Sequence, residues 1–169
     1  MILFLIGMPG AGKTYWGKRL ALEYGLGHTD LDECIEEIAC KTIPQIFRED
    51  GEEVFREMEA TTLRNVTQSV KRDTIISCGG GTPVFHDNLA YMKGHGCTVY
   101  LQASLVYLAD RLRNTDANRP LIDDAVAERL QQLYENRKNI YEQAHHIVDA
   151  ETLTVGNFAE IIAKCKHQH

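Results

Sequence analysis

The feature that most constrains the fold of this chain is a short apolar run followed directly by a glycine-rich loop. The run Ile2–Ile6 leads into Gly7-Met8-Pro9-Gly10-Ala11-Gly12-Lys13-Thr14, which matches the pattern G-x-x-x-x-G-K-[ST] at every fixed position. An amphipathic segment, Lys13–Tyr24, follows. A buried strand, a phosphate-binding loop and a helix in this order predict an α/β domain that binds a nucleoside triphosphate. A plain strand-to-helix turn is the alternative, but such a turn has no need for Lys-Thr at the start of a helix.

Each part of the loop has a chemical task in this interpretation. The glycines allow positive φ angles and close approach of the backbone to an anion. Successive N–H groups then face the phosphates, with the positive end of the helix dipole behind them. Lys13 supplies a cation for the β- and γ-phosphates, and the Thr14 hydroxyl is a ligand for Mg²⁺. The predicted nucleotide-binding residues of the loop are Gly10, Ala11, Gly12, Lys13, Thr14 and Tyr15.

The rest of the chain alternates short apolar runs with longer helical patterns, as expected for a parallel sheet with crossover helices. We expect strands at residues 2–6, 27–29, 74–78, 97–101 and 146–148. We expect helices at residues 13–24, 52–70, 105–113, 125–144 and 155–164. A length of 169 residues without repeats or linkers predicts one domain, 1–169. No apolar run is long enough to span a bilayer, and the stretch 1–8 is expected to be a strand rather than a signal peptide.

Charge and cysteine usage narrow the possible partners and location. The net charge of −6 argues against nucleic-acid binding. Between Asp30 and Glu59 the chain carries eleven acidic and three basic residues, mostly as a solvated helix face. The five cysteines (34, 40, 78, 97 and 165) form no C-x-x-C pair. We therefore expect reduced, mostly buried thiols without a metal or redox role, in a cytoplasmic protein. The histidines, including His145 and His146, show no metal-ligand spacing.

The residues that follow each expected strand are candidates for a second binding site, because ligands of open α/β sheets bind beyond the carboxyl ends of the strands. After the short second strand comes Asp30-Leu31-Asp32; if this segment is extended, both carboxylates leave the same face. After the strand at 74–78 comes Gly79-Gly80-Gly81, whose backbone can approach a ligand closely. That strand ends without an acidic residue that could bind a metal ion. A carboxylate ligand must therefore come from another segment, and Asp30 is the natural candidate.

Arginines gather in a polar stretch between the fourth strand and the last long helix. Arg111 and Arg113 precede Asn114–Asn118, which has almost no apolar residue to anchor it, and Arg119-Pro120-Leu121 follows. The stretch from about 111 to 122 is predicted to be a mobile lid. A basic lid beside a phosphate loop suits a phosphoryl-transfer enzyme, which must exclude water.

These elements together resemble the shikimate kinase family, part of the group related to nucleoside-monophosphate kinases. The resemblance covers essentially the whole chain. It rests on the phosphate loop, D-L-D at 30–32, F-R at 55–56, G-G-G at 79–81, R-P-L at 119–121 and Arg137 on a late helix. The resemblance implies a three-layer α/β/α fold of the P-loop kinases, with a central, mostly five-stranded parallel sheet. It also implies transfer of a phosphoryl group from ATP, with Mg²⁺, to the 3-hydroxyl of shikimate.

The resemblance also implies roles for individual residues in an acceptor site formed by about residues 30–60. Arg56 and Arg137 would bind the shikimate carboxylate, for which the planar guanidinium is suited. Asp32 and the backbone of residues 79–81 would hold the ring hydroxyls, and Asp32 would act as general base or would orient the attacking hydroxyl. Phe47 and Phe55 would line the pocket.

For the nucleotide, the resemblance implies that Asp30 holds Mg²⁺ through water, together with Thr14. Lys13 and Arg119 would stabilise the charge on the transferring phosphoryl group, with Arg119 supplied by the lid. An arginine before the lid would cover adenine; Arg113 is preferred, and Arg111 is the alternative.

Several alternatives stay open from the sequence alone. Asp30 can be only a helix N-cap, and Arg56 can be only a partner for Glu52, Glu53 or Glu59 on its own helix. Arg137 can be a surface residue, and Tyr134 and Tyr141 are expected to pack with hydrated hydroxyls. The acceptor can be gluconate or a nucleoside monophosphate, although D-L-D and G-G-G disfavour both. A nucleotide-dependent switch without an acceptor would leave Arg56 and the lid unexplained. A monomer is the default expectation.

Overall fold

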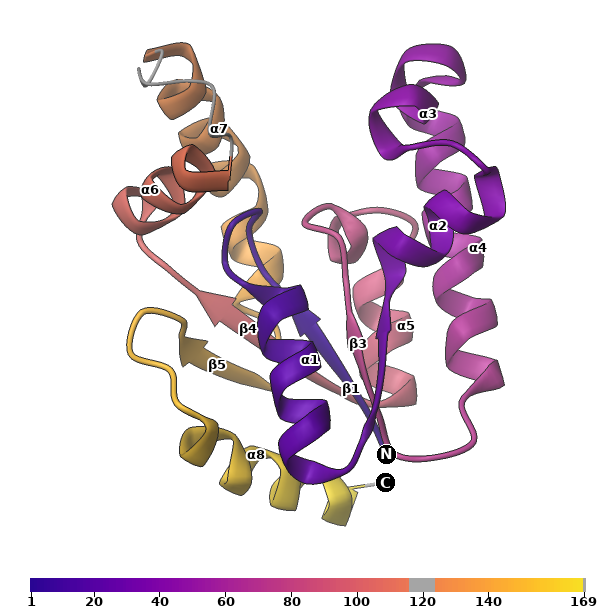
Figure 1. Cartoon of the computed structure of the whole chain (residues 1–169), viewed down its shortest axis with the longest axis vertical. Helices are drawn as coiled ribbons and strands as arrows, with labels where there is room; N and C mark the ends of the chain where they lie inside the picture. Colours follow the sequence, from indigo (N-terminus) through magenta and orange to yellow (C-terminus); the bar gives the residue numbers. More distant parts are fainter. Residues whose placement is uncertain (116–123, 169) are drawn as a thin grey trace.

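The computed structural model describes residues 1–115 and 124–168, and these contain one five-stranded parallel sheet. The strands lie in the order β2-β3-β1-β4-β5 (Figure 1). Their bounds are β1 Ile2–Ile6, β2 Gly27–Asp30, β3 Thr74–Ser77, β4 Cys97–Gln102 and β5 His146–Asp149. All five expected strands are therefore confirmed, each to within one residue at either end.

The central strands are buried on both faces, which explains why they appear in the sequence as continuous apolar runs. In β1 the four residues 3–6 are fully buried, and this strand pairs with β3 on one side and β4 on the other. The first contact of each pairing aligns Ile2 with Thr74 and Leu3 with Cys97. The carboxyl ends of the strands therefore meet along one edge of the sheet, where the phosphate loop follows β1.

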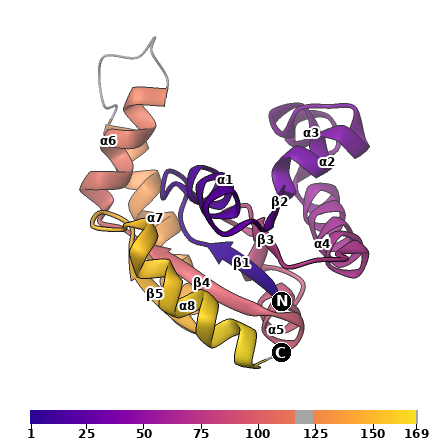
Figure 2. The ribbon, with the colours of Figure 1, turned by 60° about the horizontal axis from the view of Figure 1, so that its bottom comes forward.

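Helices cover both faces of this sheet, as expected for a three-layer α/β/α arrangement. α1 (Lys13–Tyr24) and α8 (Val155–Gln168) lie on one face, and α5 (Asn88–His95) and α7 (Asp124–Tyr141) lie on the other (Figures 1 and 2). Beyond the carboxyl edge of the sheet, α2 (Leu31–Ala39), α3 (Ile43–Glu49) and α4 (Gly51–Ser69) pack together on one side. α6 (Leu105–Thr115) stands with α7 on the other side (Figure 1).

The structure adds three helices that the sequence interpretation did not include: α2, α3 and α5. α2 begins directly after Asp30, so residues 30–32 are not extended, and the condition under which both carboxylates would leave the same face of a strand is not met. Asp30 instead caps this helix, because its Oδ1 accepts hydrogen bonds from the N–H groups of Asp32 (3.0 Å) and Glu33 (3.4 Å). α3 opens with a capping box between Thr42 and Gln45, a signal that is present in the sequence as T-I-P-Q.

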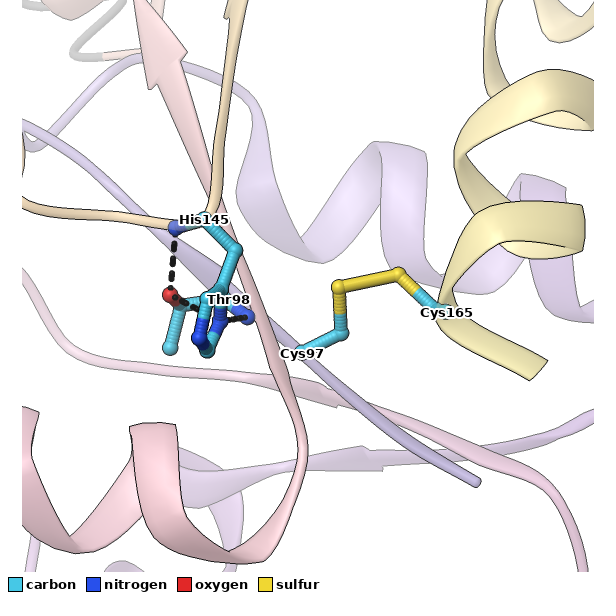
Figure 3. Close-up of a disulfide and its surroundings, with 4 residues drawn as sticks. All are labelled: Cys97, Thr98, His145 and Cys165. Atoms are coloured by element: carbon cyan, nitrogen blue, oxygen red, sulfur yellow. Dashed lines mark hydrogen bonds between the residues drawn. A yellow bond between two sulfur atoms is a disulfide. The ribbon is translucent and has the colours of Figure 1, made fainter. Parts of the chain in front are cut away.

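The expectation that the cysteines are reduced thiols is also wrong for two of the five. Cys97, at the start of β4, and Cys165, on α8, are joined by a disulfide across 68 residues of sequence (Figure 3). Spacing along the chain gave no sign of this pair, because only the packing of α8 on the sheet brings the two sulfurs together. Cys34, Cys40 and Cys78 are free thiols. In the part of the chain that the structure describes, no helix is long and apolar enough to cross a membrane.

Candidate functional site

The phosphate loop has a backbone conformation that requires glycine. Gly7, Gly10 and Gly12 have φ angles of +144°, +84° and +88°, and Gly12 is the N-cap of α1. A Cβ on Gly7 would lie 2.7 Å from the carbonyl oxygen of Leu101 on β4. The loop is therefore held against the sheet, with the N-terminus of α1 behind it.

Lys13 is folded back onto the loop that precedes it. Its Nζ donates hydrogen bonds to the carbonyl oxygens of Gly7 (2.9 Å) and Met8 (3.0 Å). Burial lowers the pKa of Lys13 to about 8, and the nearby Asp32 carboxylate opposes this shift. The side chain is thus still a cation at neutral pH. To bind a nucleotide, it needs only to replace its two hydrogen bonds to loop carbonyls with hydrogen bonds to phosphate oxygens.

Thr14 and Asp30 form a contact between the start of α1 and the end of β2. The Thr14 hydroxyl donates to Asp30 Oδ2 at 2.6 Å, while Asp30 Oδ1 caps α2. Asp30 is only 7% exposed. The cap and the metal-ligand interpretations of Asp30 are therefore compatible, because the two carboxylate oxygens have separate partners. Two oxygen donors beside a phosphate loop fit Mg²⁺, a hard cation that prefers oxygen ligands.

Asp32 carries the most unusual carboxylate of the site. Its Oδ1 is buried and has no hydrogen-bond partner among the described residues. Burial, together with the negative charge of Asp30, raises the pKa of Asp32 to about 6, although Lys13 acts in the opposite direction. A Cβ on Gly79 would lie 2.8 Å from this same Oδ1. An unpaired buried acceptor is costly, so its position here points to a donor that arrives with a ligand.

Arg56 lies in a buried network with Glu59, one of the three partners that the sequence left open for it. Its Nη1 donates to Glu59 Oε2 at 2.9 Å, and the Glu59 side chain is 1% exposed. Glu59 Oε1 in turn accepts a hydrogen bond from the Thr82 hydroxyl at 2.5 Å. The guanidinium also contacts Glu52 at 3.0 Å and lies 4.2 Å from the ring centroid of Phe85. Arg56 therefore does form an ion pair on its own helix, as one alternative from the sequence proposed. Its pair with Glu59, however, is buried rather than solvated.

The glycine triplet connects these side chains. A Cβ on Gly81 would collide with the guanidinium of Arg56, and one on Gly80 would lie 3.2 Å from Nη1 of Arg137. Arg56 comes from α4 and Arg137 from α7, so two helices on opposite sides of the opening bring arginines to one turn. Phe47 and Phe55 pack with their ring centroids 4.6 Å apart beside Arg56. The structure thus brings together Asp32, both arginines and all three glycines.

Tyr141 stabilises the glycine triplet through a hydrogen bond, a role that its position in the sequence did not reveal. Its hydroxyl donates to the carbonyl oxygen of Gly80 at 2.5 Å, and its ring stacks on Tyr100. The residue is fully buried, and burial raises its pKa to about 12. The expectation of a hydrated Tyr141 hydroxyl is therefore wrong. The sequence does not show which turn α7 faces, so it could not identify Gly80 as the partner of Tyr141.

A cavity of about 590 Å³ opens between the phosphate loop and these carboxylates. Arg111 and Leu112 close it on the α6 side, and Arg111 donates to the Tyr107 hydroxyl at 2.9 Å. Arg113 is exposed and lines a different hollow between α6 and α7. Arg119 and most of the predicted lid lie outside the described residues. The cavity is lined by Pro9, Gly10, Gly12, Lys13, Thr14, Tyr15, Asp30, Asp32, Cys78, Gly80, Arg111 and Leu112.

Comparison with known proteins identifies the family. The family model described as shikimate kinase matches residues 9–166, which include the phosphate loop from Pro9 onward, both aspartates, the glycine triplet and the arginines. The chain belongs to the shikimate kinase family. The match extends over nearly the whole chain, so the resemblance inferred from the motifs is confirmed.

Individual shikimate kinases agree with this assignment in sequence and in fold. The chain is 41% identical over 155 residues to a shikimate kinase of Phocaeicola vulgatus, covering 89% of this chain and 87% of that protein. It superposes with a TM-score of 0.89 on a shikimate kinase structure from Bacteroides thetaiotaomicron, at 35% identity and over 96% and 98% of the two chains. A shikimate kinase from Acinetobacter baumannii, solved in complex with shikimate, superposes with a TM-score of 0.82 at 30% identity, over 96% and 90%. The expected P-loop kinase fold is therefore confirmed, and the chain is an ATP-dependent kinase.

Proposed function

We propose that this chain transfers the γ-phosphoryl group of ATP to the 3-hydroxyl of shikimate, giving shikimate 3-phosphate and ADP. The observation that carries the proposal is the buried, unpaired Oδ1 of Asp32 beside the glycine triplet, across the cavity from the phosphate loop. A nucleotide-binding site alone has no use for such a carboxylate. Membership of the family, and a relative solved with shikimate, support the same acceptor.

The nucleotide half of the site consists of the loop residues 10–15 and the N-terminus of α1. Backbone N–H groups and Lys13 bind the phosphates, and Lys13 exchanges its loop carbonyls for phosphate oxygens when ATP enters. Thr14 and Asp30 are the residues that would hold Mg²⁺, whose bound charge offsets that of the phosphates. Arg111 is better placed than Arg113 to contact the nucleotide, because Arg111 lines this cavity.

The acceptor half consists of residues from about 30 to 60, the glycine triplet and Arg137. Arg56 and Arg137 converge on Gly80 and Gly81 and would bind the carboxylate of shikimate as a pair of guanidinium donors. Glu59 and Thr82 hold Arg56 in place without reaching solvent. With its carboxylate fixed there, shikimate presents a ring hydroxyl to Asp32.

The transfer step uses Asp32 to hold the reacting hydroxyl. A carboxylate with a pKa of about 6 is ionised at neutral pH and accepts a hydrogen bond from the 3-hydroxyl, or its proton as the oxygen–phosphorus bond forms. The bond from the γ-phosphorus to the bridging oxygen breaks in the same displacement, and Lys13 neutralises charge on the phosphoryl oxygens. Arg119, from a lid over about residues 111–122, would add a second cation and exclude water.

We further propose that the enzyme works as a cytoplasmic monomer on small molecules, without nucleic-acid or membrane partners. The net charge of −6 supports the absence of a nucleic-acid partner. The cytoplasm is the compartment in which ATP is supplied. This location no longer rests on the cysteines, since two of them form a disulfide.

The proposal is tested by measuring ADP release with ATP alone and with ATP plus each of three acceptors: shikimate, gluconate and a nucleoside monophosphate. Strong stimulation by shikimate alone is expected, because only shikimate combines a carboxylate for two arginines with a ring hydroxyl for Asp32. Stimulation by either of the others, or by none of the three, would contradict the assigned acceptor.

A further inference from the structure

A second cluster of potential ligands lies at the opposite edge of the sheet from the phosphate loop. It consists of Cys97 at the start of β4, His146 at the start of β5 and Cys165 on α8. One ligand atom from each of the three lies within 4.8 Å of the other two. Figure 3 shows the two cysteines reaching toward each other from the strand and the helix.

The register of the sheet explains why these three side chains meet. β4 and β5 pair so that His146 lies opposite Val99, two residues after Cys97. Residues two apart on a strand share a face, and directly paired residues of neighbouring strands do too. Cys97 and His146 therefore point to the same face of the sheet, and α8 covers that face with Cys165 (Figure 2). Thr98 points the other way and binds His145 through hydrogen bonds of 3.0 and 3.1 Å (Figure 3).

His146 has an unused ring nitrogen in this cluster. Its Nε2 is buried, and no hydrogen-bond partner for it exists within residues 1–115 and 124–168. A buried polar nitrogen without a partner is costly, and an imidazole nitrogen beside two sulfurs is a ready metal ligand.

We propose that Cys97, His146 and Cys165 form a binding site for a thiophilic divalent metal ion such as Zn²⁺ when the disulfide is reduced. The disulfide is then the oxidised, metal-free form of the same site. A disulfide alone would not explain why the buried Nε2 of His146 lacks a hydrogen-bond partner among the described residues. Two thiolates, one imidazole and a fourth position for water match the ligand set and coordination number of zinc.

The chemistry of this exchange balances with a dithiol or phosphine as the reductant. Two electrons from the reductant break the sulfur–sulfur bond, and two protons complete the thiols. The metal ion then displaces both thiol protons to solvent. Two thiolates and one dication sum to zero charge, which suits a site whose sulfurs are fully buried.

The site is separate from the proposed Mg²⁺ site in both place and chemistry. Thr14 and Asp30 offer hard oxygen donors at the carboxyl edge of the sheet, whereas the cluster offers sulfur and nitrogen at the amino edge. Cys165 lies in the last turn of α8, which finishes at Gln168. Helix ends fray at low cost in free energy, so this turn gives the ion and the reductant a route to the sulfurs.

The test is a cobalt titration of the full-length protein, before and after reduction with a phosphine. Co²⁺ is the probe because thiolate ligands give it a charge-transfer absorption band that imidazole alone does not, so the tail histidines 167 and 169 do not interfere. Thiol counts establish that the pair is reduced, and zinc added afterwards competes for the site. The variants are Cys97→Ser, Cys165→Ser and His146→Asn, with Cys40→Ser as a matched control at an exposed free cysteine. Circular dichroism checks that each variant is folded.

We expect one equivalent of cobalt with the sulfur band in the reduced protein and in Cys40→Ser, its displacement by zinc, and no such band in the oxidised protein. The band should disappear in both cysteine variants. His146→Asn should weaken cobalt binding by more than the about 10- to 100-fold that is typical of losing an outer-sphere partner. The proposal is overturned if reduced wild-type protein shows no sulfur band, if the band survives in Cys97→Ser or Cys165→Ser, or if His146→Asn binds as tightly as wild type. A pair that stays oxidised in the folded protein under phosphine also overturns it.

Discussion

Replacing Asp32 with asparagine is expected to slow phosphoryl transfer and to stabilise the fold at the same time. The substitution keeps the size of the side chain and removes its charge. Asp32 holds the acceptor hydroxyl in the proposed mechanism, so turnover should fall by about 10²- to 10⁴-fold, the usual contribution of a general base. Nucleotide binding should change little, because the phosphates contact the loop and Lys13 rather than Asp32.

The gain in stability follows from the pKa of Asp32. A rise from 3.8 to about 6 means that folding penalises the charged carboxyl relative to the unfolded chain. At neutral pH the roughly two-unit rise corresponds to about 3 kcal/mol of destabilisation. An amide in the same place leaves a donor without an assigned partner, which costs about 1 kcal/mol. The net expectation is a free energy of unfolding about 2 kcal/mol higher in Asp32→Asn.

The sign of this effect predicts its pH dependence. Protonation of Asp32 begins in the folded protein near pH 6 and in the unfolded chain only near pH 4, so the penalty disappears as pH falls through this window. Urea unfolding at pH 7, 6, 5 and 4 measures the difference in the free energy of unfolding between wild type and Asp32→Asn. Glu33→Gln is the matched control, because Glu33 is an exposed neighbour on α2 whose ion pair with Lys18 is solvated. The control should shift stability by less than about 0.5 kcal/mol.

Two results would refute this reasoning. If Asp32→Asn is no more stable than wild type at pH 7, the carboxylate is not penalised by its surroundings. If the difference in the free energy of unfolding does not shrink toward pH 4, the higher stability of the variant does not come from removing the charge of Asp32. Near-normal turnover in the variant would separately remove Asp32 from the proposed mechanism.

Four further substitutions test the acceptor half of the site. Arg137→Ala should raise the KM for shikimate several-fold more than the KM for ATP in steady-state kinetics, and equal effects would mean that the carboxylate site is elsewhere. Arg56→Ala should destabilise the protein by about 3 kcal/mol in urea unfolding, because it leaves the buried Glu59 carboxylate without its charged partner. Adding Glu59→Gln should recover part of that loss, and a double variant less stable than the single one would contradict the account. Gly81→Ala places a Cβ on the Arg56 guanidinium and should raise the KM for shikimate while leaving that for ATP nearly unchanged; a matching rise in both would show a general distortion instead.

The central strands of the sheet could be predicted from the sequence because they are buried on both faces. A strand such as β1, with residues 3–6 fully buried, appears as an apolar run with clear ends. The missed helices lack this kind of signal. α2 is densely acidic, and its charges indicated a solvated helix face without giving the bounds of a helix; α5 is short and contains Gly94. α3 could have been found from its capping box.

The candidate site could be predicted where its residues follow strands or loops with a fixed pattern, as for Lys13 and Thr14. Residues that act through long-range packing could not. Glu59 is one of eleven acidic residues in its segment, and only the fold separates the buried one from its solvated neighbours. Tyr141 reaches Gly80 across 61 residues, and Cys97 pairs with Cys165 across 68. No local pattern encodes such partners.

In the proposed reaction, the γ-phosphoryl group of ATP is transferred within the cavity to one hydroxyl of shikimate. Phosphorus–proton NMR of the reaction mixture identifies which oxygen carries the new phosphate and compares its amount with the ADP formed. We expect a single phosphate monoester coupled to the proton on carbon 3 of the ring, in equal amount to ADP. ADP with free inorganic phosphate and unchanged shikimate, or a phosphate on another oxygen, would show that the proposed transfer is wrong.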